Sequence, residues 1–481
     1  MTRRVRPVVI LMLALTGVVT LAQGTLDRSK PPTPGRPPML RVPAWTRSTL
    51  ANGAELVVSE KHDLPLVSFT ITFSGGYNQA DPVARRGLAD MTAAMMSEGT
   101  RTRDGEALAA ALQLLGTTVA VRIGGETGTI AFQCIASKFP ATLDIVADLL
   151  VNPSFPPEAL ERLRAQRLVA LVQARDQPGA IASRVFPRLV YGSAHPYGQN
   201  VTEATLKAIT RDDVVAFHRA YFRPGQALVT VVGDVNIAVA KASIEKALTA
   251  WPRGGEKPAF QYPAVPAPRA STIYLADKPG AAQSTFAIGT TGPPRNTPDY
   301  YALQVMNTIL GGMFQSRLNA NIREEKGYSY GVGSSFAYGK GPGAFRAGGD
   351  IVSAKSDAAL MEFMKELRGI RGERPITDEE LSTAKDALTQ RLPGTFASAQ
   401  SVNTAIVSLW TQGLPDDYYQ QYAARIAAIR REDVVRVARQ YVDVDHLVIA
   451  IVGDRAAIEG PLRATGVAPV AITDIEGTSL Q

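Results

Sequence analysis

The first half of the chain contains both strand-like and helix-like patterns of apolar residues. STLANGAELVVSE (48–60) places Asn52-Gly53 between two apolar runs, which is the pattern of a β-hairpin. LVSFTITFSGG (66–76) predicts another strand, and ALVTVVGDV (227–235) predicts a buried strand that closes this half. We expect further strands near 117–136, and helices over 84–97, 138–150, 156–175 and 211–221, the last with Thr210 as its cap.

The same pattern returns in the second half of the chain. TRDDVVAFHRAYFRPGQALVTVVGDV (210–235) aligns without a gap with RREDVVRVARQYVDVDHLVIAIVGDR (430–455), a shift of 220 positions. Near the start of each half, SFTITFSGG (68–76) resembles TFAIGTTGP (285–293), a shift of 217 positions. A nearly constant shift across a whole half indicates a duplicated domain.

The two copies divide the chain into domains. The segment between them, PRGGEKPAFQYPAVPAPRA (252–270), is rich in Pro and Gly and has the composition of a linker. We predict a first domain over 46–251, a second domain over 271–465 and a C-terminal tail over 466–481. Because strands and helices do not alternate regularly, we expect an α+β fold, in which each domain is a mainly antiparallel sheet with helices packed on it.

The N-terminus has the features of a secretory signal peptide. Residues 1–24 have three arginines, Arg3, Arg4 and Arg6, near their start. An apolar run of 16 residues follows from Pro7 to Ala22, and small residues stand at the end. That run is shorter than the roughly 20 residues that a membrane-spanning helix needs, and an uncleaved membrane tether is the alternative. Residues 25–45 carry six prolines and predict an extended N-terminal arm.

Composition and charge exclude some classes of partner and chemistry. The chain has 481 residues, of which 45% are hydrophobic, so it can bury more than one core. Its formal net charge of +7 includes the three arginines of the signal segment, and the other basic residues are scattered, which argues against nucleic acid as a partner. The lone Cys134 lies in the strand-like run TIAFQCIAS, which favours a buried structural thiol.

The histidines do not form a recognisable metal motif. The chain has four of them, and no two lie close enough in sequence for an HxxEH, HExxH or HxxxH pair. A ligand set assembled from distant histidines is the open alternative, but isolated histidines are more often structural or exposed. The sequence also lacks a GxSxG nucleophile elbow and a phosphate-binding glycine loop. The four residues are His62, His195, His218 and His446.

A second region of chemical interest is LGGMFQSRLNANIREEKGYSYGVGSSF (310–336). A Gly-Gly turn leads into a helix, then an REEKG exit, then a strand of alternating small and aromatic residues. Arg323 and Tyr330 are seven positions apart, and both side chains could reach one surface if the helix ends near Gly327. Such a pair offers donors for a carbonyl or a carboxylate. From spacing alone, a solvated arginine and a packed strand tyrosine are the more ordinary interpretation.

Several segments together resemble the insulinase-like, or pitrilysin-like, zinc metallopeptidases, which include the mitochondrial processing peptidase. The resemblance covers about 46–460, and its most specific part is RLNANIREEKGYSYGVGSSF. It implies the two-domain fold, arranged as half of a clam-shell chamber. The other segments that carry it are TLANGAELVV, GLADMTAAMMSEGT, SAHPYGQNVTEATLKAIT and VVGDV.

The resemblance also implies that the zinc site is lost. Active members read GLAHFLEHMLFKGT in pattern where this chain has GLADMTAAMMSEGT, so the two zinc histidines fall on Asp90 and Ala94, and the catalytic Glu falls on Ala93. A third ligand, a Glu on a later helix, would fall near Val169 or Ala170, within a segment (162–175) that contains no carboxylate. Loss of all four groups implies a subunit that holds no metal.

Some members of this family are heterodimers, which suggests a role for such a chain. One subunit carries zinc, and the other supplies an Arg/Tyr pair from its second domain, which Arg323 and Tyr330 match in type and spacing. The resemblance therefore implies a periplasmic, metal-free subunit that positions peptide substrate for a homologous zinc-bearing partner. A structural protein without proteolysis, and a homodimeric peptide-binding or chaperone-like protein, are the alternatives. An independently active peptidase is the weakest of them.

Overall fold

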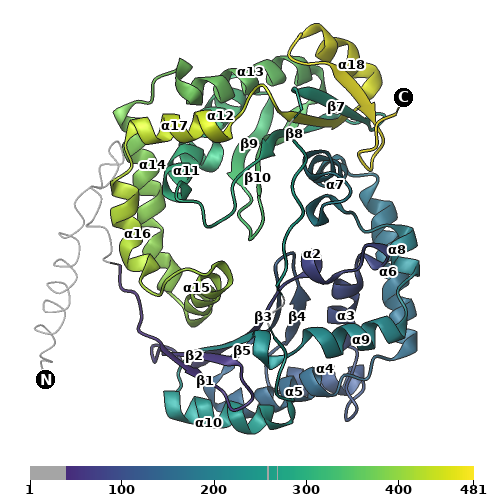
Figure 1. Ribbon diagram of the computed structural model, residues 1–481, viewed down its shortest axis with the longest axis vertical. Coiled ribbons are helices and arrows are strands. Elements are labelled where there is room, and N and C mark those ends of the chain that lie inside the picture. Colours follow the sequence, from purple (N-terminus) through teal and green to yellow (C-terminus); the bar gives the residue numbers. More distant parts are fainter. Residues whose placement is uncertain (1–39, 257–258, 268, 481) are drawn as a thin grey trace, which may run out of the picture. The chain divides into compact units, whose positions relative to one another are not determined.

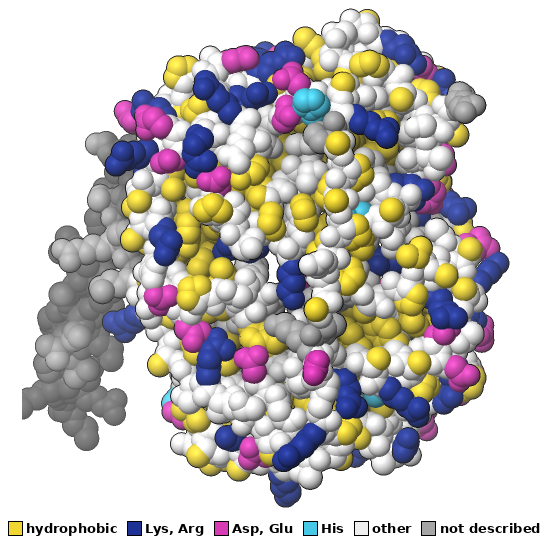
Figure 2. Space-filling model, viewed as in Figure 1, with side chains coloured by type: hydrophobic (Ala, Val, Ile, Leu, Met, Phe, Trp, Pro, Cys, Tyr) yellow, Lys and Arg dark blue, Asp and Glu magenta, His cyan; other side chains and the backbone are white. Residues whose placement is uncertain are grey.

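The computed structural model describes residues 40–480 except 257–258 and 268 (Figure 1). The predicted signal peptide, 1–24, and most of the predicted arm, 25–45, lie outside the described residues. No helix in the described part of the chain is long and apolar enough to cross a membrane. On the face seen in Figure 2, basic and acidic side chains are interspersed, in agreement with the scattered charge of the sequence.

The first half of the chain forms a six-stranded sheet in the order β1-β2-β6-β3-β5-β4. Only the β2–β6 pair is parallel, so the sheet is mainly antiparallel, as predicted. The expected hairpin joins β1 to β2 through Gly53, whose φ of +100° suits glycine. In chain order the strands are β1 (Thr46–Thr49), β2 (Glu55–Glu60), β3 (Leu66–Ser74), β4 (Ala120–Ile123), β5 (Thr127–Ile135) and β6 (Ala227–Gly233).

The second half repeats this sheet with the order β12-β7-β11-β8-β10-β9. Apart from the edge strands β1 and β12, strands at equivalent positions in the two orders are equivalent in the sequence repeat, which confirms the duplication. The edge strand β12 lies within the segment predicted as a tail, 466–481, and pairs in parallel with β7. The strands are β7 (Thr272–Asp277), β8 (Gln283–Thr291), β9 (Ser329–Phe336), β10 (Ala344–Val352), β11 (Val448–Gly453) and β12 (Val470–Thr473).

Helices cover the sheets, and α3, α5, α6 and α9 of the first half agree with the helices predicted from the sequence, whereas α7 was not predicted. Thr210 caps α9 as predicted: its hydroxyl accepts the Asp213 N–H at 3.2 Å, and the Asp213 carboxylate accepts the Thr210 N–H at 2.9 Å. In this half the helices are α2 (Tyr77–Ala80), α3 (Leu88–Met96), α4 (Gly105–Leu114), α5 (Phe139–Val151), α6 (Pro157–Ala174), α7 (Pro178–Tyr191), α8 (Glu203–Lys207), α9 (Arg211–Tyr221) and α10 (Ile237–Ala247).

The helices of the second half repeat most of this succession. They are α11 (Tyr300–Asn307), α12 (Arg317–Asn319), α13 (Ser356–Arg368), α14 (Asp378–Gln390), α15 (Ala399–Gln412), α16 (Tyr418–Ala427), α17 (Arg431–Tyr441) and α18 (Arg455–Ala464). Each half has a large apolar core of its own, around Phe69 and Phe73 in the first and around Phe286 and Phe363 in the second.

One pair of equivalent helices is exchanged between the halves (Figure 1). α7 of the first half packs on β8 and β11 of the second sheet, whereas α15 of the second half packs on β3 and β6 of the first sheet. Asn403 of α15 fixes this contact, because its amide donates to the Ser68 carbonyl at 3.0 Å and accepts from the Thr230 hydroxyl at 2.8 Å. The predicted domains therefore follow the repeat in the sequence, but each sheet is covered partly by the other half.

Candidate functional site

The helix that resembles a metal-binding helix, α3, is intact as a packing element. It begins after Gly87, which has a φ of +102°. The Asp81 carboxylate satisfies two free N–H groups there, those of Gly87 at 2.8 Å and Ala89 at 2.7 Å. Its inner face packs in the core of the first half through Leu88, Met91 and Met95, with Ala94 half-buried.

The positions of the zinc ligands hold an ion pair instead. Asp90 is exposed on α3, and its carboxylate accepts a hydrogen bond of 2.7 Å from Arg167 of α6. Ala93 is 2% exposed and Ala94 half-buried, and neither carries a polar group. The Asp90–Arg167 pair is largely solvated and stabilises the contact between the two helices by about 1 kcal/mol or less.

The position of the third ligand on α6 is also without a donor. Val169 and Ala170 are exposed, and Arg162 of the same helix pairs with Glu98 just beyond α3. Within the described residues, no group of three or more His, Cys, Asp or Glu side chains is placed to hold a metal ion. The donor set of α3 and α6 does not fit zinc, and two Arg–carboxylate pairs connect these helices.

The histidines take part in separate local contacts. His218 is half-buried with Nε2 3.0 Å from the Leu150 carbonyl, and loss of solvent around the ring lowers its pKa to about 4. His195 is buried and accepts the Tyr197 N–H at 3.1 Å. The remaining two lie beside carboxylates, His62 at Asp234 and His446 at Asp443. Cys134 is buried, and burial raises the pKa of its thiol to about 11, as expected of an inert structural cysteine.

The second candidate region is a continuous unit of helix, turn and strand. Arg323 lies in a wide-turn (π) helix, Ala320–Glu325, that follows α12. Gly327 ends this helix with a φ of +66°, and its N–H donates to the Arg323 carbonyl at 3.1 Å. The chain then enters β9 at Ser329, in the order that the REEKG exit predicted.

The Arg323 side chain lies at the surface against an aromatic ring. Its guanidinium carbon is 4.5 Å from the centre of the Phe314 ring, and Nε is 3.2 Å from the Glu324 carboxylate. Phe314 is itself 60% exposed, so the ring and the cation form one surface feature. The Nη groups of Arg323 form no hydrogen bond with the described residues.

Tyr330 is directed into solvent by a β-bulge. Ser329 pairs with Ile351 and Val332 with Gly349, so two residues of β9, Tyr330 and Gly331, oppose one residue of β10. The Ser329 hydroxyl holds the bulge by donating to the Asp350 carbonyl at 2.6 Å and accepting the Gly331 N–H at 3.0 Å. Tyr330 is 88% exposed, so the alternative of a packed strand tyrosine is wrong.

The structure thus presents Arg323 and Tyr330 on adjoining parts of one unit. In the described part of the chain, no hydrogen bond joins them to each other. Each offers donors to an external group, and the described residues place no metal cluster beside them. Both side chains carry hydrogen-bond donors, and neither supplies an activated nucleophile. Phe314 was missed by sequence reasoning, because only folding brings its ring to Arg323.

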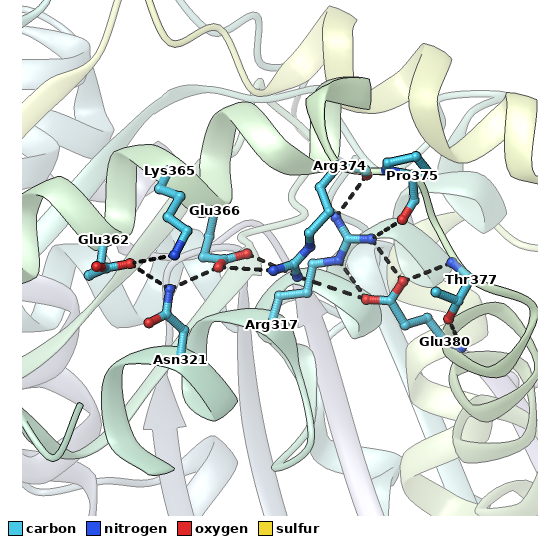
Figure 3. A network of polar contacts seen from close by, with 9 residues as sticks. All are labelled: Arg317, Asn321, Glu362, Lys365, Glu366, Arg374, Pro375, Thr377 and Glu380. Carbon is cyan, nitrogen blue, oxygen red and sulfur yellow. Dashed lines mark hydrogen bonds and ion pairs between the residues drawn. The ribbon is translucent and has the colours of Figure 1, made fainter. Parts of the chain in front are cut away.

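A buried polar network anchors the helix that carries Arg323 (Figure 3). Arg317 of α12 donates to both carboxylate oxygens of Glu380 on α14, at 2.6 and 2.8 Å. Asn321 donates to Glu362 at 2.8 Å and to Glu366 at 2.9 Å, both on α13. The helix is therefore fixed to two neighbouring helices by side chains one turn apart, while Arg323 points outward.

The start of β9 is held just as closely. The Asn319 amide donates to the Phe314 carbonyl at 2.8 Å and accepts the Val332 N–H at 3.3 Å, which ties the Phe314 loop to the strand. The backbones of Gly311 and Gly333 are in contact. A Cβ atom on Gly311 would lie 2.3 Å from the amide nitrogen of Ser334, so the site has no room for a side chain. Together these contacts make a rigid support for an exposed aromatic and cationic surface.

Two family models match the chain. The model described as Insulinase (Peptidase family M16) matches residues 56–188, and the model described as Peptidase M16 inactive domain matches residues 208–388. The first match covers the degenerate α3 helix, and the second covers Arg323 and Tyr330.

Individual proteins are similar over most of their length. An uncharacterized zinc protease of Streptomyces coelicolor is 24% identical over 82% of this chain and 86% of its own. The non-peptidase homolog YmxG of Helicobacter pylori is 23% identical over 83% and 92%. Among solved structures, a peptidase M16 inactive domain of Pseudomonas fluorescens has a TM-score of 0.77 at 25% identity, covering 85% of this chain and 98% of that one.

Proposed function

The chain belongs to the insulinase (M16) peptidase family, and we propose that it is a metal-free, substrate-binding subunit of a heterodimeric zinc endopeptidase. The observation that carries the proposal is a contrast between two sites of one fold. The helix that resembles a zinc helix has an ion pair and two alanines in place of the zinc ligands and the catalytic Glu. The Arg323–Tyr330 unit, in comparison, is anchored to α13 by the hydrogen bond from Asn321 to Glu366, and its Tyr330 side chain is exposed.

In this proposal Arg323 donates hydrogen bonds to a backbone carbonyl of an extended peptide, with the Tyr330 hydroxyl beside it. A guanidinium bonded to a carbonyl forms a charge-assisted contact, and a fixed geometry lowers the entropic cost of aligning the substrate. Phe314 supports the Arg323 side chain, so less of its freedom is lost on binding. These residues position peptide and do not cleave it.

The cleavage chemistry belongs to a homologous partner in this account. That partner carries HxxEH, and its zinc ion supplies an activated water with a Glu as base. The N-terminal residues 1–24 support export to the periplasm as the place where the two subunits meet.

The test is a reconstituted complex with a zinc-bearing homologue from the same cells. We expect Arg323→Ala to lower turnover of a peptide substrate by about 10- to 100-fold, which corresponds to the loss of a charged hydrogen bond, without weakening assembly. Arg368→Ala is the matched control, since Arg368 is an exposed arginine on α13. Unchanged turnover in the Arg323 variant would refute the positioning role.

A second candidate function has one observation in its favour. The H. pylori relative, which covers 83% of this chain, bears the name of a non-peptidase homolog. A non-proteolytic homodimer that binds peptides with the same surface would need no zinc-bearing partner. Peptide binding by the chain alone, together with a homodimeric mass in solution, would favour this function.

A further inference from the structure

A cavity of about 550 Å³ lies where the first half meets the β9–β10 hairpin of the second. Its first-half wall includes Tyr77 and Tyr197, and its second-half wall includes Arg346 of β10. The tip of the hairpin reaches across, and the Gly341 N–H donates to the Tyr197 hydroxyl at 3.3 Å. The volume falls within the roughly 300–1,000 Å³ of typical ligand sites, which often form between domains.

One cation in this cavity forms no hydrogen bond or ion pair with the described residues. Arg346 makes no hydrogen bond and no ion pair with the described part of the chain, and its guanidinium lies 6.0 Å from the centre of the Phe186 ring. Burial lowers the pKa of Arg346, which reflects the cost of removing its charge from water. Arg184, on the same helix as Phe186, is paired in contrast with Glu476 at 2.6 Å. A desolvated arginine normally has an acceptor.

A second cation, Arg86, also lines the cavity. Arg86 is 3% exposed and donates hydrogen bonds only to neutral oxygens, the carbonyls of Tyr77 and Pro196 and the side chain of Asn78, while the Asp81 carboxylate attracts it without a hydrogen bond. The one carboxylate of the lining, Glu126, already accepts hydrogen bonds from the hydroxyl of Tyr197 at 2.7 Å and from that of Tyr262 in the linker at 2.5 Å. The lining therefore contains two guanidinium groups and one carboxylate, and that carboxylate is already hydrogen-bonded to two tyrosine hydroxyls.

We infer that this cavity binds the C-terminal carboxylate of a peptide, with Arg346 as its direct partner. Asp350 of the same strand attracts Arg346 electrostatically but forms no hydrogen bond or ion pair with it and is not part of the cavity lining. The planar fork of an arginine matches a carboxylate through two parallel hydrogen bonds. The rings of Phe186, Tyr191 and Tyr197 supply apolar walls for the last side chain, and the volume admits a few residues rather than a long chain. That the carboxylate belongs to a peptide rests on the proposed function, whereas the anion site itself rests on the cavity.

The experiment measures binding of a fluorescein-labelled hexapeptide ending in phenylalanine to the full chain, by fluorescence polarisation. Two further compounds are measured in the same assay. One is the same peptide with a C-terminal amide, and the other is unlabelled N-acetylphenylalanine, which is added as a competitor. We expect the free acid to bind about tenfold or more tightly than the amide. Arg346→Gln should remove that preference, Arg346→Lys should keep part of it, and the control Arg368→Gln should keep all of it. Because Arg346 forms no hydrogen bond or ion pair with the described residues, its variants should melt close to the temperature of the wild type.

The outcomes separate this inference from the proposed function. Equal binding of acid and amide by the wild type overturns the carboxylate site, while peptide binding that depends on Arg323 leaves the proposed function standing. Loss of the acid preference only in the Arg346 variants supports the site. If N-acetylphenylalanine competes as strongly as the whole peptide, the cavity recognises a small carboxylate and the peptide assignment falls. If neither peptide binds, alone or with a zinc-bearing partner, both proposals fail.

Discussion

Removing the Arg317 side chain should destabilise the second half of the protein strongly. Its side chain is 2% exposed, and it donates to Glu380 twice and to the carbonyls of Arg374 at 3.3 Å and Pro375 at 3.1 Å. Arg317→Ala leaves a partly buried carboxylate and two carbonyls without these donors. Breaking a buried pair from one side costs about 3–5 kcal/mol. Glu380 is 26% exposed and still accepts the Thr377 N–H at 2.9 Å, so we expect a loss of unfolding free energy at the lower end of this range, about 3 kcal/mol.

The assay is urea denaturation followed by near-UV circular dichroism, with two reference variants. Arg47→Ala removes an exposed pair with Asp416, whose side chains are 35% and 49% exposed, and should cost about 1 kcal/mol or less. Arg317→Met combined with Glu380→Leu replaces both charges by apolar groups and should cost less than Arg317→Ala. A loss below about 1 kcal/mol in Arg317→Ala would refute the argument that this network anchors the Arg323 helix.

The same pair predicts a dependence on pH. Burial by itself would raise the pKa of the Glu380 carboxyl, but the Arg317 guanidinium and the Thr377 N–H lower it below its usual value. A carboxyl with a depressed pKa in the folded state stabilises the protein above its unfolded pKa, and this stability is lost as the pH falls through the folded value. Below about pH 4 the wild type should therefore lose more stability than Arg317→Ala does.

Three further predictions concern the exchange of helices, the half-buried His218 and the bulge. Asn403→Ala should cost about 1–3 kcal/mol and raise proteolysis of α15, because it removes the buried hydrogen bonds of the Asn403 amide with the Thr230 hydroxyl and the Ser68 carbonyl; unaltered proteolysis would contradict this. His218, with a pKa near 4, should make stability rise with pH from about 4 to 6.5, by up to about 3 kcal/mol, since the unfolded chain binds the proton more readily; a titration of His218→Gln should lack this slope, and an equal slope would refute the assignment. Ser329→Ala should release the bulge and lower turnover of the complex as Tyr330→Phe does, with unchanged assembly in a co-purification assay; full turnover would show that the bulge does not position the tyrosine.

The sequence predicted the sheets and the duplication because both depend on local patterns. Strands alternate over a few residues, and the repeat recurs at a nearly constant shift. The exchange of α7 and α15 was not predictable in this way, since an amphipathic face shows that a helix is covered but not by which sheet. α7 was missed altogether, because Pro178 and Pro187 suggest a break, although the first stands in the opening turn, where proline is tolerated. The edge strand β12 has four residues, too few for a pattern.

The candidate site was predictable where single residue types carry the chemistry. The absence of ligands at Asp90, Ala93 and Ala94 follows from the sequence, and the structure adds the Arg167 pair that connects the helices instead. The exposure of Tyr330 was not predictable, because it depends on a bulge that Ser329 holds through the backbone of a distant strand. Arg346 gave no signal in the sequence, since only the folded cavity reveals that it forms no hydrogen bond or ion pair with the described residues.

The central claim is that this chain works beside a zinc-bearing homologue. The most direct test is to purify the tagged protein from its own cells and to identify what accompanies it by mass spectrometry. The account predicts a chain of similar size that bears HxxEH, in about equal amount, with zinc at one ion per pair. Recovery of the protein alone, or only with partners that lack a zinc motif, would contradict the account.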